Sequence, residues 1–176
     1  MKLYRTLALS AAVAGAAVAV IAVSARAGGD KVAYPANYDK GVLYVTVDRA
    51  DVKQVREFYG PRTAIDAAKK GQPMPSGTVL TMVQYAAQLG ADGNPTKDAN
   101  GRLTKGNLVA YAIMEKRTGW GTEYADNVRN GEWEYQVFLP DKKVNDKANL
   151  TACFNCHKPK ADVDYLFTLD KLKAAK

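Results

Sequence analysis

The residues best suited to carry chemistry lie together in one pentapeptide near the C-terminal end. The chain of 176 residues holds two cysteines and one histidine, and all three fall within Cys153-Phe154-Asn155-Cys156-His157. Two thiols at this spacing can form thioether bonds to haem, and the adjacent histidine can then bind the iron as its axial ligand. The pattern therefore predicts one covalently attached haem c, held through Cys153 and Cys156, with His157 as the metal ligand.

Two other chemistries use cysteines at this spacing. A Cys153–Cys156 redox pair normally follows a strand in a βαβ unit, which the surrounding sequence does not suggest. A zinc ion would need a fourth ligand from a carboxylate, and the adjacent Cys156 and His157 suit its tetrahedral geometry poorly. Haem attachment is the favoured interpretation, and a thiol–disulfide protein without haem is the remote alternative.

The sequence offers no obvious protein ligand for the second axial position of the iron. None of the 19 residues after His157 is a methionine or a histidine. Upstream lie Met74, Met82 and Met114, and methionine is more often a packing residue than a ligand. An open distal position favours ligand binding or catalysis, whereas a methionine on the iron would indicate an electron carrier.

The N-terminal segment predicts export. Two basic residues precede an uncharged stretch over residues 7–23, and Ser24-Ala25-Arg26-Ala27 then matches an A-x-A cleavage site. This order is typical of a secretory signal peptide, predicted over residues 1–27, which leaves 28–176 as a single exported domain. An uncleaved anchor is the alternative, because the uncharged stretch is at the short end of what spans a bilayer. We expect a periplasmic protein with no membrane association after cleavage.

The charge of the chain argues against a nucleic-acid partner. The formal net charge of +7 falls to +4 when the predicted signal peptide, with three basic residues and no acid, is removed. The remaining basic residues are dispersed and form no block interleaved with aromatic side chains. This charge would suit a redox partner protein with an acidic surface, although a merely solvated surface is the favoured explanation.

The elements that must position the pentapeptide are predicted to be strands with a few short helices. β-Branched and aromatic residues, often alternating with polar ones, predict strands over 42–47, 52–58, 78–85, 107–115 and 133–139. Capping signals predict helices over 62–70, 150–158 and 168–176. Turn signals at 92–95 and 100–101 predict an extended hairpin. The predicted fold class is β-rich α+β, an antiparallel sheet with short helices and a C-terminal haem-attachment helix.

An exported, β-rich chain with a C-terminal C-x-x-C-H motif resembles the cytochrome P-460 family, which includes the β-sheet cytochromes c′-beta. The resemblance covers essentially the whole mature chain. It rests on an ordered set of patterns: Pro35-x-x-Tyr38, Lys69-Lys70 before a Gly-Thr-Val strand, Tyr111 to Glu115, and Ala152-Cys153-x-x-Cys156-His157-Lys158 with Val163 to Thr168 behind it. It implies an antiparallel β fold, a homodimer, a five-coordinate haem c and chemistry on hydroxylamine or nitric oxide.

The resemblance also implies residues for the distal side of the haem. Catalytic members carry a lysine cross-linked to the haem, together with an arginine and a glutamate. By motif position Arg56 matches the arginine, in Val55-Arg56-x-x-Tyr59, and Glu115 matches the glutamate. Such a carboxylate can accept protons from hydroxylamine as it is oxidised, and Arg56 can orient a bound nitrogen oxide. The alternative role for both residues is a salt bridge at the rim.

The lysine position is where this chain departs from the catalytic pattern. Counted from Gly77-Thr78-Val79 it falls on Met82, and no lysine occurs between Gly71 and Gly90. This departure argues against hydroxylamine oxidation at a lysine-linked haem and makes Met82 a candidate for haem contact, modification or axial ligation. Two functions therefore stay open: binding or conversion of small nitrogen species at an open site, and electron transfer with Met82 as sixth ligand.

Overall fold

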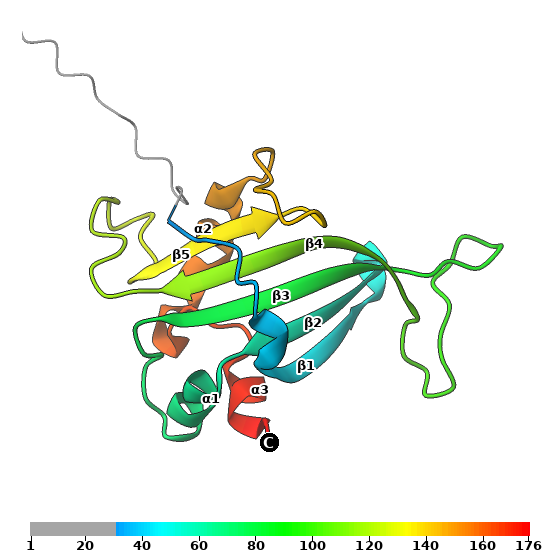
Figure 1. Cartoon of the computed structure of the whole chain (residues 1–176), viewed down its shortest axis with the longest axis horizontal. Coiled ribbons are helices and arrows are strands. Elements are labelled where there is room, and N and C mark those ends of the chain that lie inside the picture. The colour runs from blue at the N-terminus through cyan, green and yellow to red at the C-terminus, as the bar shows by residue number, and fades with distance from the viewer. Residues whose placement is uncertain (1–30) are drawn as a thin grey trace, which may run out of the picture.

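A computed structural model describes residues 31–176 (Figure 1), so the predicted signal peptide lies outside the described residues. Five strands form one antiparallel sheet in chain order, and each strand pairs with the next one along the sequence. The strands are β1 (Val42–Arg49), β2 (Gln54–Gly60), β3 (Thr78–Ala87), β4 (Lys105–Lys116) and β5 (Trp133–Phe138).

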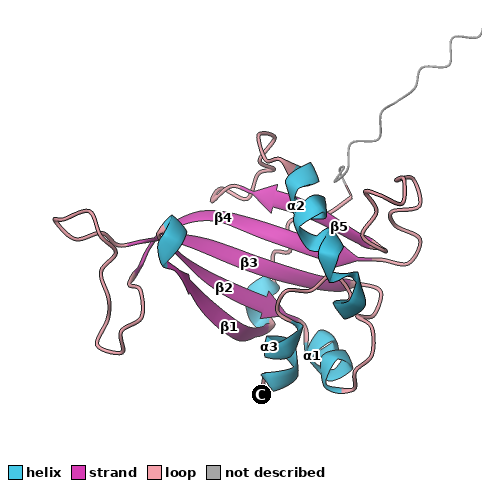
Figure 2. Cartoon of the chain, turned by 180° about the vertical axis from the view of Figure 1, so that it is seen from behind, coloured by secondary structure: helices cyan, strands magenta, loops and turns pink. Residues whose placement is uncertain are grey.

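Three short α-helices accompany the sheet and lie over one of its faces (Figure 2). They are α1 (Arg62–Lys69), α2 (Leu150–His157) and α3 (Leu169–Ala174), with 3-10 turns η1 (Tyr38–Lys40), η2 (Ala50–Val52) and η3 (Lys158–Val163). The segment before β1 crosses the opposite face (Figure 1). The predicted fold class is confirmed. In residues 31–176 no helix is long and apolar enough to cross a membrane.

Local chemistry explains where the elements begin and end. The second strand starts two residues later than predicted, because η2 and Lys53, with a left-handed φ of 51°, make the tight connection from β1. Helix α1 ends at Lys69, and Gly71 follows at a φ of +65°, a conformation that glycine adopts without strain. The turn η3 was not predicted, and it continues directly from α2.

Strand register separates two faces of the sheet, which we call the helix face and the opposite face. Across β2, β3, β4 and β5 one row of paired residues runs through Phe58, Met82, Ala112 and Val137. The next row on the same face, two residues along each strand, contains Leu80, Met114 and Tyr135. These side chains pack with α1, α2 and α3 in the main core. Because side chains alternate along a strand, Val83, Tyr111 and Ile113 belong to the other face, where they form a second core with aromatic residues of the N-terminal segment.

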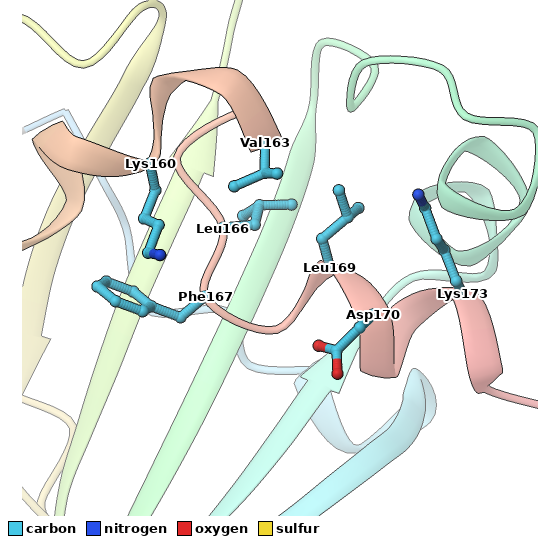
Figure 3. Close-up of a pocket in the computed structure, with 7 residues that line it drawn as sticks. All are labelled: Lys160, Val163, Leu166, Phe167, Leu169, Asp170 and Lys173. Carbon is cyan, nitrogen blue, oxygen red and sulfur yellow. The ribbon is translucent and has the colours of Figure 1, made fainter.

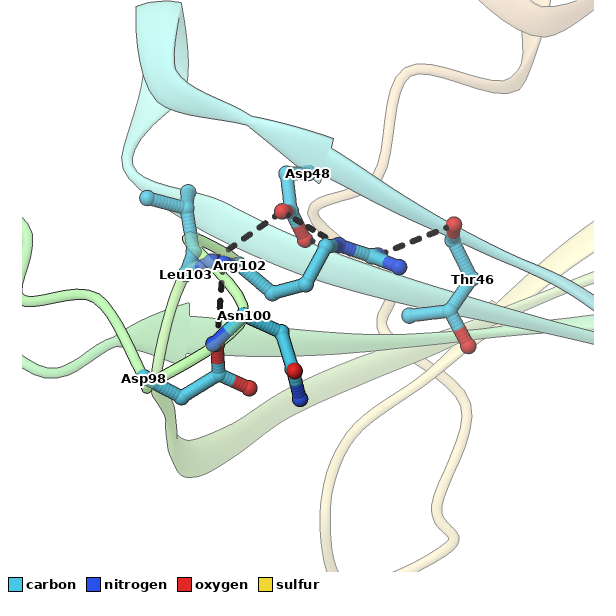
Figure 4. A network of polar contacts seen from close by, with 6 residues as sticks. All are labelled: Thr46, Asp48, Asp98, Asn100, Arg102 and Leu103. Carbon is cyan, nitrogen blue, oxygen red and sulfur yellow. Dashed lines mark hydrogen bonds and ion pairs between the residues drawn. The ribbon is translucent and has the colours of Figure 1, made fainter.

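The long connection between β3 and β4 folds back onto β1 (Figure 4). The Asp48 carboxylate accepts hydrogen bonds from Arg102 Nε at 2.7 Å and from the Leu103 backbone N–H at 3.0 Å. Arg102 Nη2 also donates to the Thr46 carbonyl at 3.1 Å. Two isolated bridges, Leu89 to Pro95 and Lys97 to Leu103, close the predicted extended hairpin. The hairpin is thus fastened to the edge strand β1.

Candidate functional site

Helix α2 carries both cysteines and the histidine. Its N-cap is Asn149, as predicted, and the side-chain oxygen of this residue accepts a hydrogen bond from the Ala152 backbone N–H at 3.2 Å. Cys153 and Cys156 lie about one helical turn apart, and both thiols are free. Cys153 is partly buried, which raises the pKa of its thiol, whereas Cys156 is exposed. The helix therefore offers two unblocked thiols on neighbouring turns, directly followed by His157.

Phe154, inside the motif, holds α2 on the sheet. Its side chain is fully buried. Its ring meets Tyr135 of β5 and Tyr124 edge-on, with centroid distances of 4.7 and 5.5 Å. Edge-to-face aromatic pairs add to the stabilisation that burial of the ring already gives. The position of the cysteines and of His157 thus depends on this ring.

A buried amide connects α2 to the strand beneath it. Asn130 is fully buried, and its Nδ2 donates to the Tyr135 hydroxyl at 3.0 Å and to the Phe154 carbonyl at 2.9 Å. One side chain of the loop before β5 therefore bonds both the strand and the motif helix. Nothing in the local sequence marks Asn130, because a loop asparagine is usually a turn residue.

We expect Asn130→Ala to lower the free energy of unfolding by about 2 kcal/mol, because it leaves buried polar groups without their partner. Urea unfolding of the purified protein measures the loss. The matched control is Asn127→Ala, an exposed asparagine in the same loop, which should change stability by less than about 0.5 kcal/mol. Equal effects of the two changes would contradict the anchoring role of Asn130.

One ring nitrogen of His157 is hydrogen-bonded to the backbone, and the other is available to bind a metal. Its Nδ1 lies 2.6 Å from the Tyr165 backbone carbonyl, which can only accept, so Nδ1 carries the proton and Nε2 has a free lone pair. The ring packs against Tyr135 and Phe167, each with a centroid distance of 5.0 Å. Burial lowers the pKa of His157, and the bond to Tyr165 opposes that shift. A neutral imidazole with an oriented Nε2 suits an axial ligand of iron.

The helix face of the sheet carries an apolar surface that the chain covers only in part. The helices lie toward one end of this face (Figure 2). Phe58, Met82, Ala112 and Val137 stand side by side on four neighbouring strands, and each is only partly buried. Central strands of a sheet normally have such a row covered, and a contiguous exposed apolar surface marks a binding site. The row and the free nitrogen of His157 together fit a flat apolar group that binds through a metal.

The comparison with protein families supplies the deciding observation. The cytochrome P460 family matches residues 35–168, which include the whole sheet and the C-x-x-C-H helix. The chain belongs to the cytochrome P460 family. This membership implies a c-type haem, and the two free thiols of α2 and the oriented His157 fit that group. Cytochromes P460 are typically periplasmic. The chain matches none of the curated proteins with which it was compared.

In this cytochrome P460, Arg56 and Met82 share one face of the sheet. Arg56 of β2 pairs with Gln84 of β3, and this pair is the next one on the same face after Phe58 and Met82. Its Nε and Nη2 both donate to Gln54 Oε1, at 3.0 and 2.8 Å. Burial lowers the pKa of the Arg56 guanidinium. The predicted arginine thus lies at the polar margin of the apolar row that contains Met82.

The structure does not bring Glu115 together with these residues. The pairing of β3 with β4 is regular from Thr78–Lys116 to Gln84–Ala110, and Ala112 and Met114 take the helix face, so Glu115 takes the opposite one. There it is 5% exposed and accepts a hydrogen bond from Arg117 Nε at 2.5 Å. Glu115 lies two residues after Ile113 on the same strand, so the two side chains point to the same face. This alternation is the sequence signal that places Glu115 on the opposite face from Met82.

A shallow pocket lies beside Phe167 (Figure 3), whose ring contacts His157 with a centroid distance of 5.0 Å. Its lining combines apolar and charged side chains: Lys160, Val163, Leu166, Phe167, Leu169, Asp170 and Lys173. Phe167 forms the wall next to His157 and is 51% exposed, and the amine of Lys160 lies 5.4 Å from the centre of its ring. The side of His157 that faces the C-terminal segment is thus closed by one aromatic ring.

Proposed function

We propose that this cytochrome P460 is an exported haem c protein that binds a small nitrogen species, nitric oxide above all, on the iron face opposite His157. Cys153 and Cys156 would hold the haem and His157 would ligate it. The haem, when bound, would supply an iron atom that can bind the small ligand. The protein's own contribution is to hold His157 in one tautomer and to provide an apolar surface for that ligand.

The observation that carries this proposal is the composition of the helix face. The paired positions of β2 to β5 around Met82 hold apolar side chains, amides, one tyrosine and one arginine, but no carboxylate and no lysine: Gln54, Arg56, Phe58, Leu80, Met82, Gln84, Ala86, Ala110, Ala112, Met114, Tyr135 and Val137. Oxidation of hydroxylamine requires proton acceptors close to the substrate. Lys116 lies two rows further along the same face, where its amine is paired with Asp164. The absence of a base from the positions around Met82 supports binding of a small uncharged ligand, and Arg56 and Gln84 can orient it from the margin.

Spectroscopy and ligand titration test this proposal. The full chain, with its own leader, is produced in a bacterium that carries a haem c maturation system, and the mature protein is purified. We expect one haem per chain, a high-spin ferric form, one nitric oxide bound per haem and no hydroxylamine turnover with an added electron acceptor. Mass mapping would find haem on Cys153 and Cys156 alone. A protein without haem, or one that oxidises hydroxylamine, would contradict the proposal.

Met82→Leu separates this proposal from the alternative, a periplasmic electron carrier with Met82 as sixth ligand. Leucine conserves the apolar volume and removes the sulfur, so we expect the spin state to stay unchanged and nitric oxide affinity to change by less than about threefold. Met114→Leu is the matched control on the same face. A low-spin wild-type protein that becomes high-spin only in Met82→Leu would establish the electron carrier instead.

The remaining proposals concern the localisation, the oligomeric state and the redox partner of the protein. We propose periplasmic localisation after cleavage behind Ala27, a homodimer, and electron exchange with a redox partner protein. The mass of the mature N-terminal peptide checks the cleavage site, and light scattering of the purified protein checks the dimer.

A further inference from the structure

The carbonyl that orients His157 sits in an unusual backbone turn. Asp164 and Tyr165 follow one another with φ of 53° and 62°, both in the left-handed region and neither of them glycine. Such residues are rare, and the surrounding structure must hold them in place. Within the turn the Tyr165 backbone N–H donates to the Lys160 carbonyl at 2.7 Å, and the ring of Tyr165 packs against Gly131.

The Asp164 side chain fixes this turn, because hydrogen-bond donors from three separate segments of the chain bind its carboxylate. Its carboxylate accepts hydrogen bonds from the Met74 backbone N–H at 2.8 Å, from Trp133 Nε1 at 3.1 Å and from Lys116 Nζ at 2.9 Å. Trp133 and Met74 are buried in the main core, and Lys116 is 9% exposed at the end of β4. The donors come from the loop after α1, from β4 and from β5, so the carboxylate ties the turn to the rigid sheet.

From this chain of contacts we propose that Asp164 is a positioning residue for the iron ligand: it holds the left-handed turn whose Tyr165 carbonyl fixes the tautomer and orientation of His157. The proposal rests on the proposed ligation of haem by His157. A hydrogen bond from Nδ1 increases the electron donation of an imidazole to its metal, and residues that support such a bond affect the metal as well. Asp164 touches neither the ligand nor the iron, and acts through Tyr165 and His157.

The test compares haem-loaded full-chain variants by two signals of the iron–histidine bond. Asp164→Ala removes the carboxylate. Asp164→Asn keeps an acceptor, and asparagine tolerates the left-handed conformation. We expect the iron–histidine stretching frequency of the ferrous protein to fall and the reduction potential to rise, because a weaker donor stabilises ferric iron less. For Asp164→Ala the ferrous-to-ferric ratio at a fixed potential should rise about tenfold, or 59 mV for a one-electron couple, with a smaller shift for Asp164→Asn.

Two further variants keep the outcome decisive. Asp162→Asn changes an exposed aspartate of η3 and should leave both signals at wild-type values. Lys116→Gln removes the charged donor without altering the turn residues, so it should give a shift of the same sign even where Asp164→Ala does not fold. Unchanged signals in haem-loaded Asp164→Asn and Lys116→Gln would overturn the positioning role. Absence of haem from the wild-type protein would overturn the proposed function, and this proposal with it.

Discussion

The Phe154→Ala variant is expected to lose about 3–5 kcal/mol of unfolding free energy, the range for removal of a large buried ring. The phenylalanine lies between the two cysteines, is fully buried, and packs against Tyr124 and Tyr135. Its loss leaves a cavity between α2 and β5, so the helix that presents His157 should also become mobile. Urea unfolding gives the energy, and the yield of haem per chain reports the loss of position.

The neighbouring residue supplies the matched control. Asn155 lies in the same helix and the same motif but is exposed, so Asn155→Ala should change stability by less than about 0.5 kcal/mol. Phe154→Leu conserves an apolar side chain and should retain a folded protein with an intermediate loss. Equal losses of unfolding free energy in Phe154→Ala and Asn155→Ala would contradict this prediction. They would show that the attached haem, and not the Phe154 ring, holds α2 on the sheet.

Local patterns are sufficient to predict the five strands and the three α-helices of the described residues, but not the 3-10 turns. The cap at Asn149, the end of α1 before Gly71 and the alternation along β3 all depend on residues a few positions apart, and the structure confirms them. The same alternation places Met82 on the helix face. Alternation along β4 places Glu115 on the opposite face from Arg56, and matching by motif position alone does not take this alternation into account.

Other features of the site could not be predicted because they depend on distant residues. No local signal marks a left-handed turn at Asp164 and Tyr165, since neither is glycine, and the groups that hold it come from positions 74, 116 and 133. Asn130 likewise acquires its role only when β5 and α2 meet. The motif points to His157 as the proposed iron ligand, whereas the groups that orient its ring are visible only in the fold.

The His157→Gly variant is expected to lose the proposed histidine ligand of the iron, and the chain has no other histidine to replace it. The substitution leaves a space bordered by the rings of Tyr135 and Phe167, each centred 5.0 Å from the missing imidazole. Added imidazole should enter this space and restore the wild-type ferrous spectrum. Failure of millimolar imidazole to do so, with haem attached, would contradict the ligand assignment.

The choice between two added ligands then tests the bond to Tyr165. Imidazole can ligate through one nitrogen and donate from the other, whereas 1-methylimidazole has no N–H for the Tyr165 carbonyl. We expect imidazole to bind at least about fivefold more tightly, since one hydrogen bond contributes about 1 kcal/mol. A haem peptide cut from the same protein serves as the reference, because its iron has no such carbonyl nearby. The same affinity ratio in the variant and in the peptide would contradict a role for the carbonyl.

Combining this variant with a change at Asp164 connects the two proposals. In the wild-type turn the carbonyl is held in place whether or not His157 is present, because Met74, Lys116 and Trp133 bind the Asp164 carboxylate and not the imidazole. The preference for imidazole should therefore persist in His157→Gly and disappear in His157→Gly with Asp164→Ala. A preference of equal size in both proteins would mean that the turn keeps its shape without Asp164, and that the backbone alone orients the iron ligand.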